Sequence, residues 1–155
     1  ARTVYCHEWN PEGSWYDRDA AAVAVFEMTD DIVYVYQGSW CAEGCRTSWE
    51  AEWRVVGTEG TVLWDGADGL HAEVIAERGE RSPRMEEVPI RVPDPDRKGR
   101  DAVIDEFIRC VRTGGTPETH AADNIRSLAM VFGAIESAEA GRKVEIRPGA
   151  VGAGE

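Results

Sequence analysis

The sequence predicts an α+β fold, in which an open, mainly antiparallel sheet of about seven strands carries two helices on one face. Two observations support this prediction. Before residue 93, short segments alternate between apolar and polar residues and are separated by turn-forming Gly, Pro and Asp residues. After residue 99, apolar residues recur every three or four positions, as on one face of a helix. Strands followed by helices are typical of α+β domains.

Seven strands are expected before the helices. The segment 47–56 alternates most clearly, because every second residue from Trp49 to Val55 is apolar. A four-residue turn at 57–60 follows, and its two glycines can take positive φ at little steric cost. Pro89 places the last of these strands at an edge. The expected strands are residues 2–8, 20–28, 32–37, 47–56, 61–64, 70–78 and 85–92.

Two helices are expected after the strands. The first covers 101–112 and ends at Gly114-Gly115, and the second begins at a Thr119 cap, runs to about Ala140 and ends at Gly141. Each helix carries an apolar stripe that is expected to face the sheet. The stripes are Ile104, Phe107, Ile108 and Val111 in the first helix, and Ile125, Leu128, Phe132 and Ile135 in the second.

The widths of these elements predict an interface. About seven strands spaced by ~4.8 Å make a sheet roughly 30–35 Å wide. Two helices, each about 10 Å across, cover most of one side and leave the other side open. The segments 20–28 and 32–37 are apolar on both faces, so the open side is also apolar. We therefore expect the open sheet face to pack against another subunit, in a homo-oligomer that is a dimer or a tetramer, or against a missing domain.

Length and charge exclude several classes of function. The 155 residues suffice for one domain, expected at 1–147 with a last short strand at 144–146 and a loose tail at 148–155. The net charge is −12, and the only lysines are Lys98 and Lys143, which argues against binding to nucleic acid or an anionic membrane. No apolar run reaches the ~18 residues that span a bilayer. Because the chain starts without Met, we expect it to be part of a longer protein.

The four cysteines give no repeated framework. Cys6 and Cys110 are predicted to be core thiols. Cys41 and Cys45 share a loop, where a zinc site completed by a histidine or a local disulfide is conceivable. Zinc sites usually show a second close ligand pair, which is absent, so no metal is expected. Reduced thiols in a cytoplasmic protein are the preferred interpretation.

The tryptophans indicate a binding site rather than a catalytic apparatus. The sequence lacks G-x-G-x-x-G, G-x-S-x-G and Walker A patterns. All six tryptophans occur at or before Trp64. Trp53 and Trp64 are interpreted as packing residues. Trp15 and Trp40 lie in predicted loops and Trp49 lies on the predicted strand 47–56. Trp40 and Trp49 adjoin a Gly-rich loop with hydroxyl and carboxylate groups, as a polyol site requires, although core or interface packing is an equally good interpretation of these two. The predicted substrate-binding residues are Trp15, Trp40, Thr47, Trp49 and Glu50.

Three motifs carry a resemblance to a known family. A strand ends in two apolar residues and G-x-x-G at 55–60, a helix exit reads F-x-x-x-V-R-x-G-x-x-P at 107–117, and A-I-x-S-A occurs at 134–138. In this order and spacing they resemble the C-terminal domain of the Gfo/Idh/MocA oxidoreductases, such as glucose–fructose oxidoreductase and inositol dehydrogenase. The resemblance implies an NAD(P)-dependent dehydrogenase of sugars, inositols or related polyols, with relatives that dimerise through the open sheet face.

The resemblance also implies what this chain lacks. The family's Rossmann domain, its E-K-P lysine and its D-x-x-x-H pair precede the matching segment, so no catalytic or cofactor-binding residue can be assigned here. The NAD or NADP would bind outside this chain. The family places an aromatic residue near the substrate at the start of the strand that matches 47–56, which here is Trp49.

Two functions follow as hypotheses. The chain is either the substrate-side and oligomerisation domain of such a dehydrogenase, inactive by itself, or a stand-alone ligand-binding or dimerisation module. The coding sequence upstream of Ala1 would separate them, because only the dehydrogenase requires a preceding G-x-G-x-x-G segment.

Overall fold

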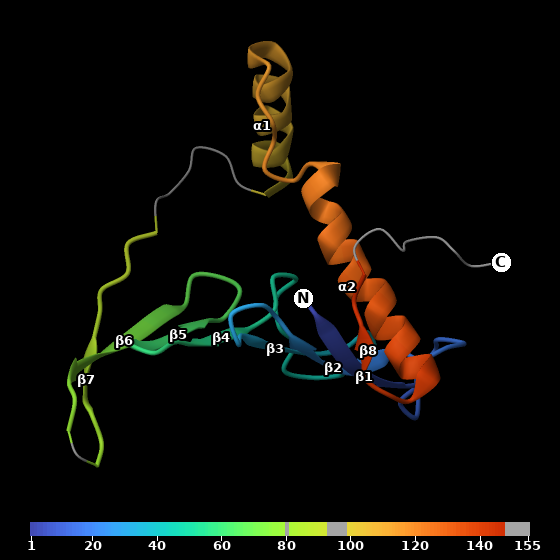
Figure 1. Cartoon of the computed structure of the whole chain (residues 1–155), viewed down its shortest axis with the longest axis horizontal. Coiled ribbons are helices and arrows are strands. Elements are labelled where there is room, and N and C mark those ends of the chain that lie inside the picture. The colour runs from blue at the N-terminus through green and yellow to red at the C-terminus, as the bar shows by residue number, and fades with distance from the viewer. Residues whose placement is uncertain (80, 93–98, 148–155) are drawn as a thin grey trace. The chain divides into compact units, whose positions relative to one another are not determined.

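The structure is a computed structural model that describes residues 1–79, 81–92 and 99–147. The chain divides into two compact units (Figure 1). The first unit comprises Ala1–Ala42 and Gly99–Glu155, and the second comprises Glu43–Lys98. The tail expected at 148–155 lies outside the described residues.

The first unit contains a four-stranded antiparallel sheet, sheet A, in the order β3-β2-β1-β8. The strands are β1 (Thr3–Trp9), β2 (Ala21–Glu27), β3 (Val33–Ser39) and β8 (Val144–Glu145). The β2–β3 hairpin turns at Asp30 and Asp31, which both take positive φ. Such a pair of left-handed residues is the geometry of type I′ hairpin turns, which match the twist of the strands.

Helix α2 (Ala121–Ala140) packs on β1 and β8 (Figure 1). The expectation that its large apolar stripe faces the sheet is wrong, because Phe132 and its neighbours in that stripe are about half exposed. The buried face instead consists of the small residues Ala129, Gly133 and Ser137. A Cβ at Gly133 would lie 3.0 Å from a side-chain carbon of Ile146, so only a small residue allows the helix this close to the sheet.

The core of the first unit lies between α2 and sheet A. It contains the buried residues Val4, Cys6, Ala24, Phe26, Ala129, Val144 and Ile146. Tyr34 stacks on Phe26 across β2 and β3, with ring centroids 5.6 Å apart. Because these residues come from both ends of the chain, folding of this unit requires the C-terminal helix and strand.

The helix ends partly agree with the sequence. Gly141 ends α2 in a left-handed conformation, as predicted. The predicted Thr119 cap is wrong, because His120 is the N-cap and its Nδ1 accepts a hydrogen bond from the Ala122 amide. Helix α1 (Gly99–Thr113) ends directly before Gly114 and Gly115, which were predicted to end it. Its apolar stripe is also largely exposed, with Phe107 58% accessible.

The second unit contains sheet B, which is antiparallel in the order β4-β5-β6-β7. Its strands are β4 (Trp53–Val56), β5 (Gly60–Trp64), β6 (Leu70–Glu77) and β7 (Arg84–Glu87). The strand expected at 47–56 is too long, since β4 begins only at Trp53. Ala51 takes a φ of 62°, which an extended strand cannot accommodate. Trp49 therefore does not share a strand face with Trp53.

The two glycines of the β4–β5 turn do not use the left-handed conformation that glycine can take. Neither Gly57 nor Gly60 takes positive φ. Gly60 is required for a different reason: a Cβ there would lie 2.2 Å from the Glu73 carbonyl oxygen of β6. The turn is therefore specified by close approach of two strands rather than by a left-handed backbone.

The predicted fold class is confirmed. The described residues form an α+β structure with two helices and eight strands, divided between two open antiparallel sheets. Neither of the helices in this part of the chain has the length and apolar character needed to cross a membrane.

Candidate functional site

Trp9 and Trp40 lie at one end of sheet A, on either side of the start of β2, and Trp15 and Tyr16 lie in the loop that joins β1 to β2. We call Trp9, Trp15, Tyr16 and Trp40 the aromatic end. The Ala20 amide donates to the Trp9 carbonyl at 3.1 Å, and the Trp40 amide donates to the Ala20 carbonyl at 2.8 Å. These two hydrogen bonds hold Trp9 and Trp40 on either side of β2.

The loop between β1 and β2 supplies the other two aromatic rings. Trp15 and Tyr16 stack with ring centroids 5.3 Å apart. The Asn10 side chain donates to the Tyr16 carbonyl at 2.8 Å and so closes the loop on itself. Trp15 and Trp40 remain 70% and 65% exposed. Both indoles are therefore accessible to a ligand.

Both predicted site residues of the first unit, Trp15 and Trp40, thus lie at the same end of sheet A. The sequence interpretation did not include Trp9 and Tyr16. A signal for them existed, since Trp9 ends a predicted strand and Tyr16 follows Trp15 directly.

The other three predicted residues, Thr47, Trp49 and Glu50, lie in the second unit. Trp49 is 91% exposed in a turn. The hydroxyl of Ser48 accepts a hydrogen bond from the Glu50 amide at 3.0 Å and donates to the Gly66 carbonyl at 2.9 Å. The turn that presents Trp49 is therefore fastened to the β5–β6 loop.

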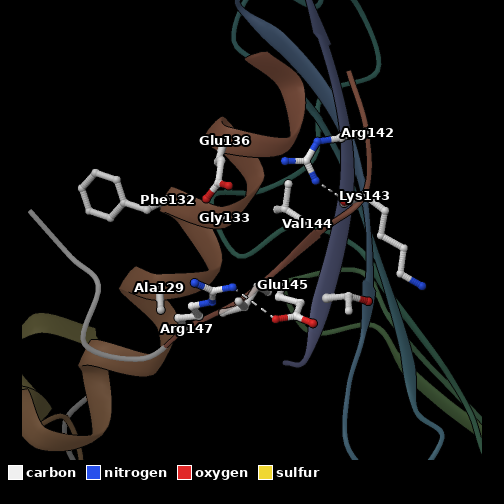
Figure 2. A pocket seen from close by; sticks show the side chains of 11 residues that line it. Ala129, Phe132, Gly133, Glu136, Arg142, Lys143, Val144, Glu145 and Arg147 are labelled. Carbon is white, nitrogen blue, oxygen red and sulfur yellow. Dashed lines mark hydrogen bonds and ion pairs between the residues drawn. The ribbon is translucent and has the colours of Figure 1, made fainter. Parts of the chain in front are cut away.

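A groove runs between α2 and β8 in the first unit (Figure 2). Its volume is about 650 Å³, and its apolar lining includes Phe132 and Val144. Charges of both signs surround it: Arg147 lies 3.5 Å from Glu145, and the Arg142 guanidinium donates to the Lys143 carbonyl at 3.4 Å. The lining also contains Thr3, Glu136 and Lys143.

Three side chains in the strands of the first unit have shifted pKa values. Burial, followed by the charge of Glu8, raises the pKa of the Cys6 thiol, which makes it less reactive. Hydrogen bonds from Lys143 and then Thr3 lower the pKa of the Glu27 carboxyl. Burial raises the pKa of the Tyr34 hydroxyl. None of these groups belongs to the aromatic end.

All four cysteines are free thiols, and Cys6 and Cys110 are buried as predicted. Within the described residues, no three or more His, Cys, Asp or Glu side chains are arranged to hold a metal ion.

The chain matches the family described as "Oxidoreductase family, C-terminal alpha/beta domain", of the Gfo/Idh/MocA type, over residues 5–146. Because this match covers most of the chain, the protein belongs to that family. The three sequence motifs therefore identified the family correctly.

Similarity to individual proteins is distant. The chain is 27% identical to "Uncharacterized protein y4oX" of Sinorhizobium fredii, over 94% of this chain and 41% of that protein. Among solved structures, it is similar to an oxidoreductase from Agrobacterium radiobacter in complex with NAD+, L-tartaric acid and magnesium. The TM-score is 0.69 at 21% identity, over 94% of this chain and 43% of that one.

It is also similar to a levoglucosan dehydrogenase in complex with NADH and levoglucosan. Here the TM-score is 0.72 at 16% identity, over 95% of this chain and 45% of the other. These structural likenesses establish the fold. The chain spans less than half the length of these relatives.

Proposed function

We propose that this chain is the substrate-side domain of an NAD(P)-dependent dehydrogenase that acts on a sugar, an inositol or a related polyol. Membership of the oxidoreductase family carries the proposal. Similar structures hold NAD+ or NADH, and one holds levoglucosan, an anhydrosugar. The free thiols are consistent with a cytoplasmic enzyme.

The residues of this chain do not fit the dinucleotide itself. Dinucleotides bind where parallel strands end against a glycine-rich helix start. The described sheets are antiparallel, and the sequence has no G-x-G-x-x-G. In the proposed enzyme the cofactor, which accepts or donates the hydride, is bound outside this chain. We expect the 155-residue chain alone to show no turnover.

This chain would bind and orient the polyol. In the first unit, the exposed indoles of Trp15 and Trp40 offer apolar surfaces for stacking on the C–H face of a polyol. In the second unit, the exposed Trp49 indole offers such a surface beside the Thr47 hydroxyl and the Glu50 carboxylate, which can bind hydroxyl groups. Binding energy of this kind holds the reacting carbon in position for hydride transfer.

We also propose that the open face of sheet A forms a subunit interface. Residues on the face opposite α2 include Tyr5, Val25, Val33 and Val35, and all four are accessible. An apolar sheet face of this kind is typical of an interface. Sedimentation of the chain at tens of micromolar should give a dimer or a tetramer, and Val35→Glu should give the monomer. A monomeric wild type would contradict the proposed interface.

The experiment that tests the enzyme proposal uses the complete coding sequence, including the region upstream of Ala1. NAD+ or NADP+ reduction is measured with a panel of sugars, inositols and their oxidised forms. Trp40→Ala should raise KM for the active polyol about tenfold, which is the loss of one stacking contact, and leave KM for the cofactor unchanged. The control is Phe107→Ala, which deletes an exposed aromatic ring of α1.

Two results would contradict the proposal. One is a Trp40→Ala enzyme with unchanged KM for the polyol. The other is a complete protein that has no dinucleotide segment and no turnover, which would support a stand-alone ligand-binding or dimerisation module.

A further inference from the structure

The groove between α2 and β8 has an apolar floor and charged walls, and the proposed dehydrogenase function does not use it. We call it the α2–β8 groove. Its volume is about 650 Å³, and small-molecule sites typically have volumes of ~300–1,000 Å³. Its floor consists of four buried residues, Ala129, Gly133, Val144 and Ile146. All of its lining residues belong to the first unit.

An apolar wall adjoins this floor. Phe132 precedes Gly133 on α2, lines the groove and is 48% exposed. The floor is accessible because the helix carries a glycine at its centre, where a larger residue would fill the space beside Ile146. An apolar group in the groove can therefore contact both the floor and the aromatic ring, and its transfer from water is favourable.

Two of the three basic side chains in the lining are engaged by carboxylates. Lys143 pairs with Glu27, which also accepts a hydrogen bond from the Thr3 hydroxyl at 2.6 Å. Arg147 lies 3.5 Å from Glu145. The charges of these two pairs compensate each other, so neither pair requires a charged ligand.

Arg142 and Glu136 lack such a partner within the described part of the chain. The Arg142 guanidinium makes one long hydrogen bond there, to the Lys143 carbonyl at 3.4 Å. The Glu136 carboxylate makes neither a hydrogen bond nor an ion pair with the residues that the structure describes. The two side chains are not paired with each other either, which leaves space between their charged ends for a ligand.

Ser137 fixes the backbone next to both of these residues. Its hydroxyl donates to the Arg142 carbonyl at 2.7 Å, and the Arg142 amide donates to the Ser137 carbonyl at 3.3 Å. Glu136 directly precedes Ser137 on α2. Figure 2 shows Glu136 on the helix wall of the groove and Arg142 on the opposite wall, next to Val144. One positive and one negative charge thus border the same apolar floor from two sides.

This arrangement favours a zwitterion over a ligand of single charge. An apolar molecule would take water from both charged groups without replacing it, which costs free energy. A carboxylate alone would pair with Arg142 but add a negative charge beside Glu136, and an amine alone would do the reverse. A free α-amino acid carries both charges on one carbon atom, and an apolar side chain suits the floor.

We propose that the α2–β8 groove binds a free α-amino acid with an apolar side chain, such as leucine. The Arg142 guanidinium binds the carboxylate, the Glu136 carboxylate binds the ammonium group, and the side chain lies against Gly133, Val144 and Phe132. The proposal does not rest on the dehydrogenase function. Binding needs neither cofactor nor turnover, so it is tested on the 155-residue chain.

The test is NMR titration of the backbone amide signals of the isotope-labelled chain with L-leucine at neutral pH. The Lys143 and Val144 signals should shift together with one Kd on the order of 1 mM, because so small a ligand has few contact atoms. Isocaproate lacks the ammonium group of leucine, and isoamylamine lacks its carboxylate. Each should bind at least about fivefold more weakly, because each pairs with only one of the two charges.

Two charge-neutralising variants check the assigned partners. Arg142→Gln should weaken leucine binding about fivefold without weakening the binding of isoamylamine. Glu136→Gln should weaken leucine binding about fivefold without weakening the binding of isocaproate. The matched controls are Arg126→Gln and Glu139→Gln, which make the same charge changes on α2 outside the groove and should leave the Kd unchanged. Circular dichroism of each variant verifies that it is folded.

The proposal is overturned if the Lys143 and Val144 signals stay fixed up to about 50 mM leucine. Equal binding of leucine and either analogue would also overturn it, as would an unchanged Kd in both groove variants. A response to leucine that appears only after deletion of residues 148–155 would overturn it for the intact chain. No outcome depends on turnover, so a failure of the dehydrogenase proposal remains distinguishable from a failure of this one.

Discussion

Ser137 connects three parts of the first unit, and its substitution gives the sharpest test of the fold. The residue is fully buried in α2. Its hydroxyl accepts a hydrogen bond from the Cys6 amide of β1 at 2.9 Å and donates to the Arg142 carbonyl at 2.7 Å. β8 pairs with β1 only at Thr3 and Val4, so Cys6 lies just beyond the paired segment. The Ser137 hydroxyl thus replaces the missing strand partner.

We expect Ser137→Ala to destabilise the first unit by about 2–3 kcal/mol. The Cys6 amide is buried and would lose its partner, which costs roughly 1–3 kcal/mol. The Arg142 carbonyl lies in a more exposed residue, so water can replace part of its lost bond. The apparent Tm should fall by about 5–10 °C.

Urea unfolding followed by far-ultraviolet circular dichroism measures this difference. Ser14→Ala is the matched control, because it removes an exposed hydroxyl that also accepts from a backbone amide, that of Tyr16. It should cost less than about 0.5 kcal/mol. Hydrogen exchange provides a local measurement, in which the Cys6 amide should lose protection beyond the global change. Equal costs for the two variants would refute the assigned role of Ser137.

Three further predictions concern the first unit. Gly133→Val should destabilise it by about 1–3 kcal/mol in urea unfolding, because the added carbons overlap Ile146; unchanged stability would mean that α2 can move away from the sheet. Asp31→Gly should raise stability by about 0.5–1 kcal/mol in the same assay, because glycine takes positive φ without steric cost, and a loss would contradict the turn assignment. The Glu27 pKa is lowered in the folded state, so its contribution is present above the unfolded pKa and disappears as the pH falls through the folded pKa. Accordingly, the Tm of Glu27→Gln, measured from about pH 6 to about pH 2, should fall less on acidification than that of the wild type, and parallel curves would contradict this.

Much of the fold could be predicted from the sequence, because alternation and helical spacing report local structure directly. Alternation failed before Trp53, where the positive φ of Ala51 interrupts a pattern that looks continuous in the sequence. Helical spacing located α2 but assigned the wrong face to the sheet. The packing there depends on how closely two backbones approach, and the repeated small residues from Ala129 to Ser137 indicate that approach better than the large ones.

The candidate site was predictable only in part. The tryptophan loops stand out in composition, so Trp15 and Trp40 could be selected. The hydrogen bonds that place Trp9 and Trp40 on either side of β2 depend on strand register, which single-residue patterns do not specify. The packing interpretation of Trp53 and Trp64 did not anticipate that both line a hollow, because the backbone carbonyls that fix their rings come from turns.

The loop between β1 and β2 is closed at its base by the Ala20–Trp9 bond and internally by the Asn10–Tyr16 bond. Residues within it form no part of the α2–sheet A core. The loop can therefore be exchanged for those of other family members as a single cassette while the strands keep their pairing. A library confined to residues 11–15 should therefore change the exposed surface of this loop at nearly constant stability, which urea unfolding of its members would measure.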